Sequence, residues 1–166
     1  MAPGQEYPRG PEAVPRELEV LVVRIAGRRY GVPVSAVREV LPLVEPRPVP
    51  AWPDFALGLI DVRGAALPLV DPAPSLGEAP LSLTPSCRVV VLAGPEGATG
   101  VVVDEVEGLL RVAPLGLEAI APASVRPHPP RCTAVFSLGG ATVPVLAPQA
   151  LIAKLADPAD PVGEAP

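Results

Sequence analysis

The sequence has few aromatic residues, few cysteines and one histidine, and each shortage excludes a class of protein. One Trp, two Phe and two Tyr make up 3% of the 166 residues, too few for the stacking platforms of a single-stranded nucleic-acid binder. Two cysteines, Cys87 and Cys132, cannot build a disulfide framework or a zinc site. His128 lies among prolines without partners at metal-ligand spacing. We therefore expect no metal and no cofactor.

Basic charge and long apolar runs are also scarce. Eighteen acidic residues against 13 basic ones give a net charge of −5, whereas nucleic-acid binding needs a basic footprint. The longest apolar runs have about six residues, far fewer than the ~20 that span a bilayer. Residues 1–16 are polar and rich in proline, unlike a signal peptide. We therefore predict a cytoplasmic protein that neither binds nucleic acid nor inserts directly into a membrane.

The motifs of common enzyme classes are missing too, since the sequence contains no G-x-S-x-G, P-loop or G-x-G-x-x-G. One alternative, a small β-barrel enzyme or ligand-binding protein, would depend on Asp61, Asp71 and Asp104. Glu105 and Glu107 extend the last of these into an acidic run, which is more typical of a solvated strand edge. We predict a protein without catalytic activity.

Turn residues and short aliphatic runs are abundant. Proline (26) and glycine (15) together contribute 41 residues and punctuate a sequence that is 49% hydrophobic. Runs rich in valine favour strands, so the pattern predicts an all-β protein. The expected strands cover residues 19–26, 30–34, 57–62, 66–70, 87–93, 99–103, 133–138 and 142–146, with shorter ones at 40–44 and 109–113. A short C-terminal helix is expected at 148–156. Residues 1–16 and 157–166 are expected to form flexible tails.

The sequence also repeats itself. Residues 58–72 align without a gap with 134–148, so that Gly64 meets Gly140 and Pro68 meets Pro144. Residues 22–37 similarly resemble 89–106. Because closure protects the edges of a small sheet, two such units predict two small five-stranded β-barrels of SH3 or OB type, at about 17–80 and 81–156. An exchange of strands between the barrels is left open.

The two units differ in charge at two positions. Arg63 meets Gly139 in the alignment, and Glu39 meets Gly108. These residues of opposite charge therefore occur in the first unit alone, which suggests that they pair. A carboxylate can hold an arginine as an oriented donor for a partner. The alternative is two unrelated surface charges.

Several motifs in the right order resemble the CheW-like family, the coupling proteins of bacterial chemosensory arrays. Residues 58–64 (GLIDVRG) followed by 67–71 (LPLVD) are similar to the family signature G-x-I-N-L-R-G…P-V-D. Residues 30–40, 50–55 and 100–106 support the resemblance, which covers roughly residues 17–156.

This resemblance implies two intertwined five-stranded β-barrels, no catalysis, and two partners. They are the cytoplasmic tip of a methyl-accepting chemoreceptor and the regulatory domain of a CheA-type histidine kinase. The resemblance places Arg63 and Glu39 on the family's coupling pair, and Val37 and Gly58 near its receptor-binding groove. The partner-binding residues implied in this sequence are Val37, Glu39, Gly58, Asp61, Arg63 and Gly64.

The sequence departs from the family pattern at four positions: Pro72, Pro74, Ala134 and Ala147. The two prolines interrupt a segment that is usually helical and charged. They motivate a second hypothesis, a specialised CheW-like paralogue that binds one partner in a motility or localisation pathway.

Overall fold

The structure is a computed structural model that describes residues 17–95, 97–113, 117–119, 132–149 and 152. It confirms the predicted all-β class. The strands are β1 (Leu18–Ile25), β2 (Arg28–Pro33), β3 (Val37–Pro42), β4 (Ala56–Val62), β5 (Ala65–Val70), β6 (Arg88–Gly94), β7 (Gly97–Val103), β8 (Glu105–Val112), β9 (Leu117–Ala119), β10 (Cys132–Leu138) and β11 (Ala141–Leu146). Two short 3-10 helices, η1 (Val34–Ala36) and η2 (Pro74–Leu76), lie between strands.

Some predicted elements differ from this pattern or lie outside the described residues. The short strands expected at 40–44 and 109–113 begin earlier, as β3 and β8, because their antiparallel ladders with β6 and β1 already include Val37 and Glu105. Both predicted tails lie outside the described residues. Of the expected C-terminal helix, Pro148, Gln149 and Ile152 are described, and they are helical.

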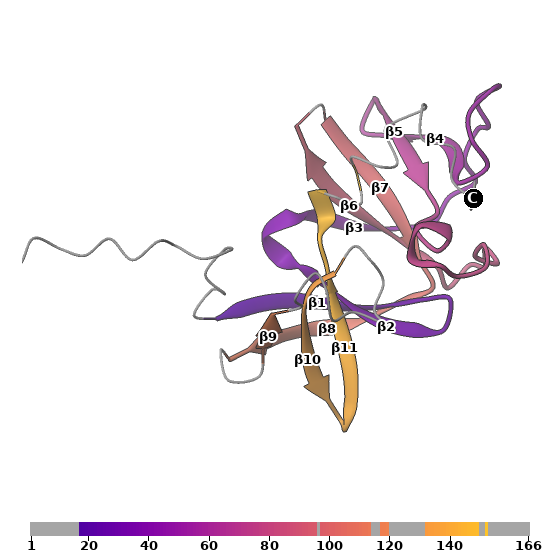
Figure 1. Cartoon of the computed structure of the whole chain (residues 1–166). Helices are drawn as coiled ribbons and strands as arrows, with labels where there is room; N and C mark the ends of the chain where they lie inside the picture. Colours follow the sequence, from indigo (N-terminus) through magenta and orange to yellow (C-terminus); the bar gives the residue numbers. More distant parts are fainter. Residues whose placement is uncertain (1–16, 96, 114–116, 120–131, 150–151, 153–166) are drawn as a thin grey trace, which may run out of the picture.

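The strands form two sheets, and each sheet combines strands from both halves of the chain (Figure 1). The first has the order β8-β1-β2-β11-β10-β9 and the second β3-β6-β7-β5-β4. In Figure 1 the first sheet therefore brings indigo strands beside orange and yellow ones. The strand exchange left open by the sequence is reciprocal, since each unit lends its first two strands to the sheet that holds the rest of the other. A boundary near residue 80 therefore separates the repeats, not the sheets.

The second sheet closes on itself through the segment that follows β3. Arg47 donates its N–H to the Leu59 carbonyl at 2.8 Å and accepts the Leu59 N–H at 2.9 Å, which forms an isolated antiparallel bridge to β4. The chain that runs along one edge of the sheet thus returns to the other edge. In the first sheet the corresponding pairing is made by β9, a sixth strand that was not predicted and that pairs with β10.

The strand registers confirm the internal repeat. In the β4–β5 hairpin Gly58 lies opposite Leu69, after a bulge that begins at Ala56. In the β10–β11 hairpin Ala134 lies opposite Val145, after a bulge that begins at Cys132. Each pair of equivalent residues is related by the same offset of 76 as the aligned sequences, so the two hairpins have the same geometry.

Three hydrophobic clusters hold the sheets together. One lies within the first sheet and includes Val20 and Val22; another lies within the second and includes Val89 and Val91. The third joins the two sheets, and takes the alternate residues of the same strands, such as Leu21 and Val23. Burial on both faces explains why the central strands are continuous apolar runs.

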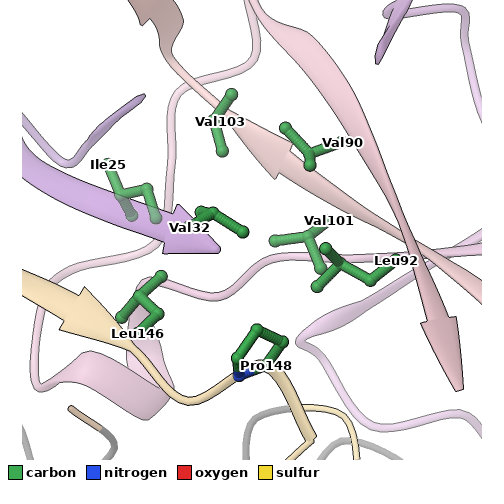
Figure 2. A pocket seen from close by; sticks show the side chains of 8 residues that line it. All are labelled: Ile25, Val32, Val90, Leu92, Val101, Val103, Leu146 and Pro148. Carbon is green, nitrogen blue, oxygen red and sulfur yellow. The ribbon is translucent and has the colours of Figure 1, made fainter. Parts of the chain in front are cut away.

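The cluster between the sheets is closely packed. It leaves a small cavity of about 10 Å³. Figure 2 shows the side chains that line this cavity, which come from β1, β2 and β11 on one side and from β6 and β7 on the other. A volume of this size holds about one water molecule, and every residue that lines it is apolar: Ile25, Val32, Val90, Leu92, Val101, Val103, Leu146 and Pro148. The cavity is a packing defect and not a ligand site.

Candidate functional site

The turn of the β4–β5 hairpin presents Arg63 at its tip. Arg63 and Gly64 have φ values of 50° and 82°, the positive pair that a two-residue type I′ turn requires. The Gly64 N–H donates to Asp61 Oδ1 at 2.9 Å and fixes the turn. The equivalent turn in the second unit has glycine at both positions, with φ of 58° and 81°. An arginine is costlier than glycine in this conformation, so the turn itself gives no reason for Arg63.

The guanidinium of Arg63 forms an ion pair with Glu39 of β3. Arg63 Nη2 donates a hydrogen bond to Glu39 Oε1, and the side chains are 71% and 30% exposed, respectively. The hydrogen bond lowers the pKa of Glu39 and raises that of Arg63. This confirms the pair that was predicted from the charge difference between the repeats. An exposed pair contributes little stability, so stability alone is a weak reason for it.

Closure of the second sheet brings the two members of the pair together. Glu39 is on β3 and Arg63 follows β4, and these strands are at opposite ends of the pairing order. The strand register also confirms the predicted counterpart of Glu39: Glu39 lies opposite Val91 after a bulge at Arg38, and Gly108 lies opposite Val22 after the equivalent bulge at Glu107. The second unit has the same backbone here without the charges.

An open depression of about 560 Å³ surrounds the pair. The apolar residues Val62, Leu67 and Val91 line it together with the charged groups, and Leu67 and Val91 are otherwise buried. The full lining is Arg38, Glu39, Val62, Arg63, Ala65, Ala66, Leu67, Val91 and Ala98. An open surface that combines apolar and charged side chains is typical of a protein-binding site, whereas small-molecule pockets are enclosed.

Four of the six predicted site residues do not line this depression. Gly58 is buried, has φ of 131°, and a Cβ there would lie 2.2 Å from the Arg47 carbonyl oxygen. Its structural role is to allow the bridge that closes the sheet. Val37 is partly buried against the cluster between the sheets. Glu39 and Arg63 line the depression, whereas Asp61 and Gly64 hold the turn that carries Arg63.

The acidic run after β7 is more ordered than the sequence suggested. Asp104 Oδ2 accepts the Gly27 N–H at 3.0 Å. Glu107 pairs with two arginines, 2.5 Å from Arg24 Nε and 2.8 Å from Arg29 Nε, although the second contact lacks hydrogen-bond geometry. The expectation of a simple solvated edge was therefore incomplete, because the arginines lie about 80 residues away in the sequence.

Asp71 is the one buried charged residue among those described, with 3% exposure. Its carboxylate accepts the N–H groups of Ala73 at 2.9 Å and Leu81 at 2.8 Å, so it anchors the proline-rich connection between the repeats. Asp61 and Asp104 likewise accept backbone N–H groups. All three residues of the β-barrel enzyme alternative thus have structural partners.

The described residues contain no group of three or more His, Cys, Asp or Glu side chains that could hold a metal ion. His128 lies outside the described part of the chain. Cys87 and Cys132 are free thiols, and burial raises the pKa of Cys132 to about 12, so this thiol is protonated and unreactive at neutral pH. No helix within the described segments is long and apolar enough to cross a membrane.

The fold and the site together define a two-sheet β protein with an ion pair, Arg63–Glu39, in a depression that is lined by both charged and apolar residues. A family model described as the CheW-like domain matches residues 19–156. The chain belongs to this family, as the sequence motifs indicated.

Individual relatives agree with this assignment. The chain is 32% identical over 95 residues to "Chemotaxis protein CheW" of Rhizobium meliloti, and the match covers 57% of this chain and 61% of the relative. It is 34% identical over 112 residues to "Protein FrzA" of Myxococcus xanthus, and there the match covers 63% and 70%. The crystal structure of the scaffolding protein TtCheW from Thermoanaerobacter tengcongensis has the same fold, with a TM-score of 0.72, 18% identity, and coverage of 89% and 93%.

Proposed function

We propose that this protein is a non-catalytic adaptor that couples chemoreceptors to a CheA-type histidine kinase, in the cytoplasm and recruited to receptor arrays. Membership of the CheW-like family supports the proposal, as do relatives whose names describe chemotaxis and scaffolding proteins. The observation that carries it is the Arg63–Glu39 pair, which the first unit has and the second lacks.

The geometry suggests how such an adaptor would engage its partner. Glu39 holds the guanidinium of Arg63, whose exposed donors remain available to a partner's carboxylate or carbonyl groups. Asp61 and Gly64 act indirectly, by fixing the turn. Gly58 allows the bridge to Arg47 that closes the sheet, and Val37 precedes Arg38 and Glu39 on β3.

Affinity capture from native lysate tests the proposal. The full-length protein should retain a histidine kinase and chemoreceptors, identified by mass spectrometry, and Arg63→Glu should lose them because it faces Glu39 with a second negative charge. Arg111→Glu is the matched control, since Arg111 is 75% exposed and lies on the first sheet. Circular dichroism and a melting curve would show that each variant is folded. Capture of neither partner by the wild-type protein would overturn the proposal.

A second candidate is an adaptor that binds one partner alone. The segment after Asp71 forms the short 3-10 helix η2 around Pro74, and this departure from the family pattern could remove one interface. Size-exclusion chromatography with kinase and receptor fragments together distinguishes the two candidates. A single ternary peak would exclude the one-partner adaptor.

A further inference from the structure

Arg38 is the second cation of the depression around Arg63. It is exposed and lines the depression together with Glu39 and Arg63. Among the residues that the structure describes, five arginines form ion pairs, namely Arg24, Arg28, Arg29, Arg63 and Arg111, and Arg38 is not one of them. Its charge is therefore not neutralised within the described structure.

A β-bulge explains why Arg38 reaches this surface. Val37 lies opposite Leu92 and Glu39 lies opposite Val91, so Arg38 is the extra residue of β3. Such bulges redirect side chains at sheet edges. The equivalent bulge residue in the second unit is Glu107, which has two internal arginine partners. The same type of bulge thus places a paired carboxylate in one unit and, in the other, an arginine without an ion pair to any described residue.

The charges around the depression do not balance. Among the described residues, two guanidiniums, Arg38 and Arg63, and one carboxylate, Glu39, line it, which leaves one positive charge in excess. The whole chain carries a net charge of −5, so the sign of the charge at this site is opposite to that of the chain as a whole. A local reversal of sign steers and orients an oppositely charged partner.

We propose that Arg38 recognises an aspartate or glutamate side chain of the protein partner that docks over the Arg63–Glu39 pair. The proposal rests on the proposed function, because it takes that partner to be the kinase or the receptor. The partner's carboxylate supplies the negative charge that the depression lacks, while neighbouring apolar side chains of the partner cover Val62 and Leu67. Arg63 orients the partner and Arg38 selects an acidic one.

The scarcity of lysine provides a direct test. Lys154 is the single lysine of the sequence, so Arg38→Lys gives the chain a second lysine, whose amine lies at position 38. A carbodiimide activates a carboxylate, and a nearby lysine amine then displaces the activating group as a urea to form an amide bond. Full-length Arg38→Lys, mixed with the kinase regulatory domain or the receptor tip captured by the wild type, should give a cross-linked peptide that contains residue 38. Arg111→Lys, at an exposed position on the first sheet beside Glu19, should give no cross-link between residue 111 and the partner.

Affinity measurements complete the test. At low ionic strength Arg38→Glu should weaken partner binding about tenfold or more, and the loss should shrink at high salt. Arg111→Glu makes the same change in net charge and should stay within about twofold of wild type. Equal affinities for Arg38→Glu and Arg111→Glu would overturn the inference. A cross-link from residue 38 to a second copy of the chain, or to Asp157, Asp160 or Glu164 of the same chain, would also overturn it.

The failure of this inference differs from that of the proposed function. If the wild type binds kinase or receptor, and Arg63→Glu weakens binding but Arg38→Glu does not, the adaptor role stands and the role of Arg38 falls. If the wild type binds neither partner, both fall.

Discussion

Replacement of Gly58 by alanine should unlink the two edges of the second sheet. The added Cβ would lie 2.2 Å from the Arg47 carbonyl oxygen and 2.6 Å from its carbon, so the backbone of residues 47 and 48 must move away. The two hydrogen bonds between Arg47 and Leu59 would then be lost, at about 1 kcal/mol each. Alanine at a φ of 131° adds about 1–3 kcal/mol of strain. We expect a total loss of about 3–5 kcal/mol.

The free energy of unfolding from urea titration measures this loss, which would lower the Tm by roughly 10 °C. Gly64→Ala is the control, because Gly64 also has positive φ (82°) but has open space where its Cβ would lie. It should therefore lose only the strain, about 1–2 kcal/mol. If the two variants unfold with free energies within about 0.5 kcal/mol of each other, a size close to the additivity error of single substitutions, the role assigned to the bridge is wrong.

Three further predictions concern carboxylates and a thiol. Asp71→Asn should lower the free energy of unfolding by about 1–3 kcal/mol, because an amide nitrogen would face one of two backbone N–H donors that Asp71 now accepts; urea titration measures this. The pKa of Glu39 should lie below the ordinary 4.5 and return to it in Arg63→Gln, as NMR titration of the side-chain carboxyl carbon would show. Cys132 should react slowly with iodoacetamide at pH 8 and rapidly in urea, because burial raises its pKa to about 12; mass spectrometry measures the extent of alkylation.

Each of these has a control and a contradicting result. Asp61→Asn, at an exposed turn, should cost less than Asp71→Asn, and the reverse order would contradict the anchoring role of Asp71. Because the pKa of Glu39 is lower in the folded state, the contribution of the pair to stability is complete above pH 4.5 and fades as the pH falls through the folded value. An unchanged Glu39 pKa in Arg63→Gln, or fast native alkylation of Cys132, would contradict the respective argument.

Much of the fold could be predicted because it is built twice. Glycine and proline punctuation located the hairpins, and the alignment of Gly64 with Gly140 anticipated two turns of the same geometry. The same comparison revealed the Arg63–Glu39 pair, since a charge that one repeat has and the other lacks needs a reason beyond the shared fold.

Other features of the fold and the site depend on tertiary contacts that the alignment of the two repeats does not reveal. Gly58 aligns with Ala134, so the alignment contained no sign that glycine is obligatory against Arg47. Arg38 lies outside the strand predicted at 40–44, and the bulge that contains it is invisible in sequence periodicity. The pairing of Glu107 with Arg24 and Arg29 depends on the β1–β8 ladder, which joins residues about 80 positions apart.

The reciprocal exchange of strands has a consequence for the origin of the site. A single repeat on its own could satisfy this topology only as a domain-swapped homodimer, in which each chain completes the sheet of the other. Such a dimer is symmetric and would display any docking surface twice. Once two repeats are joined in one chain, here through the connection that Asp71 anchors, their sequences can differ. One repeat can then carry Arg63 and Glu39 while the other has Gly139 and Gly108 at the equivalent positions. Covalent linkage thus converts a symmetric assembly with two equivalent docking surfaces into an asymmetric protein with one.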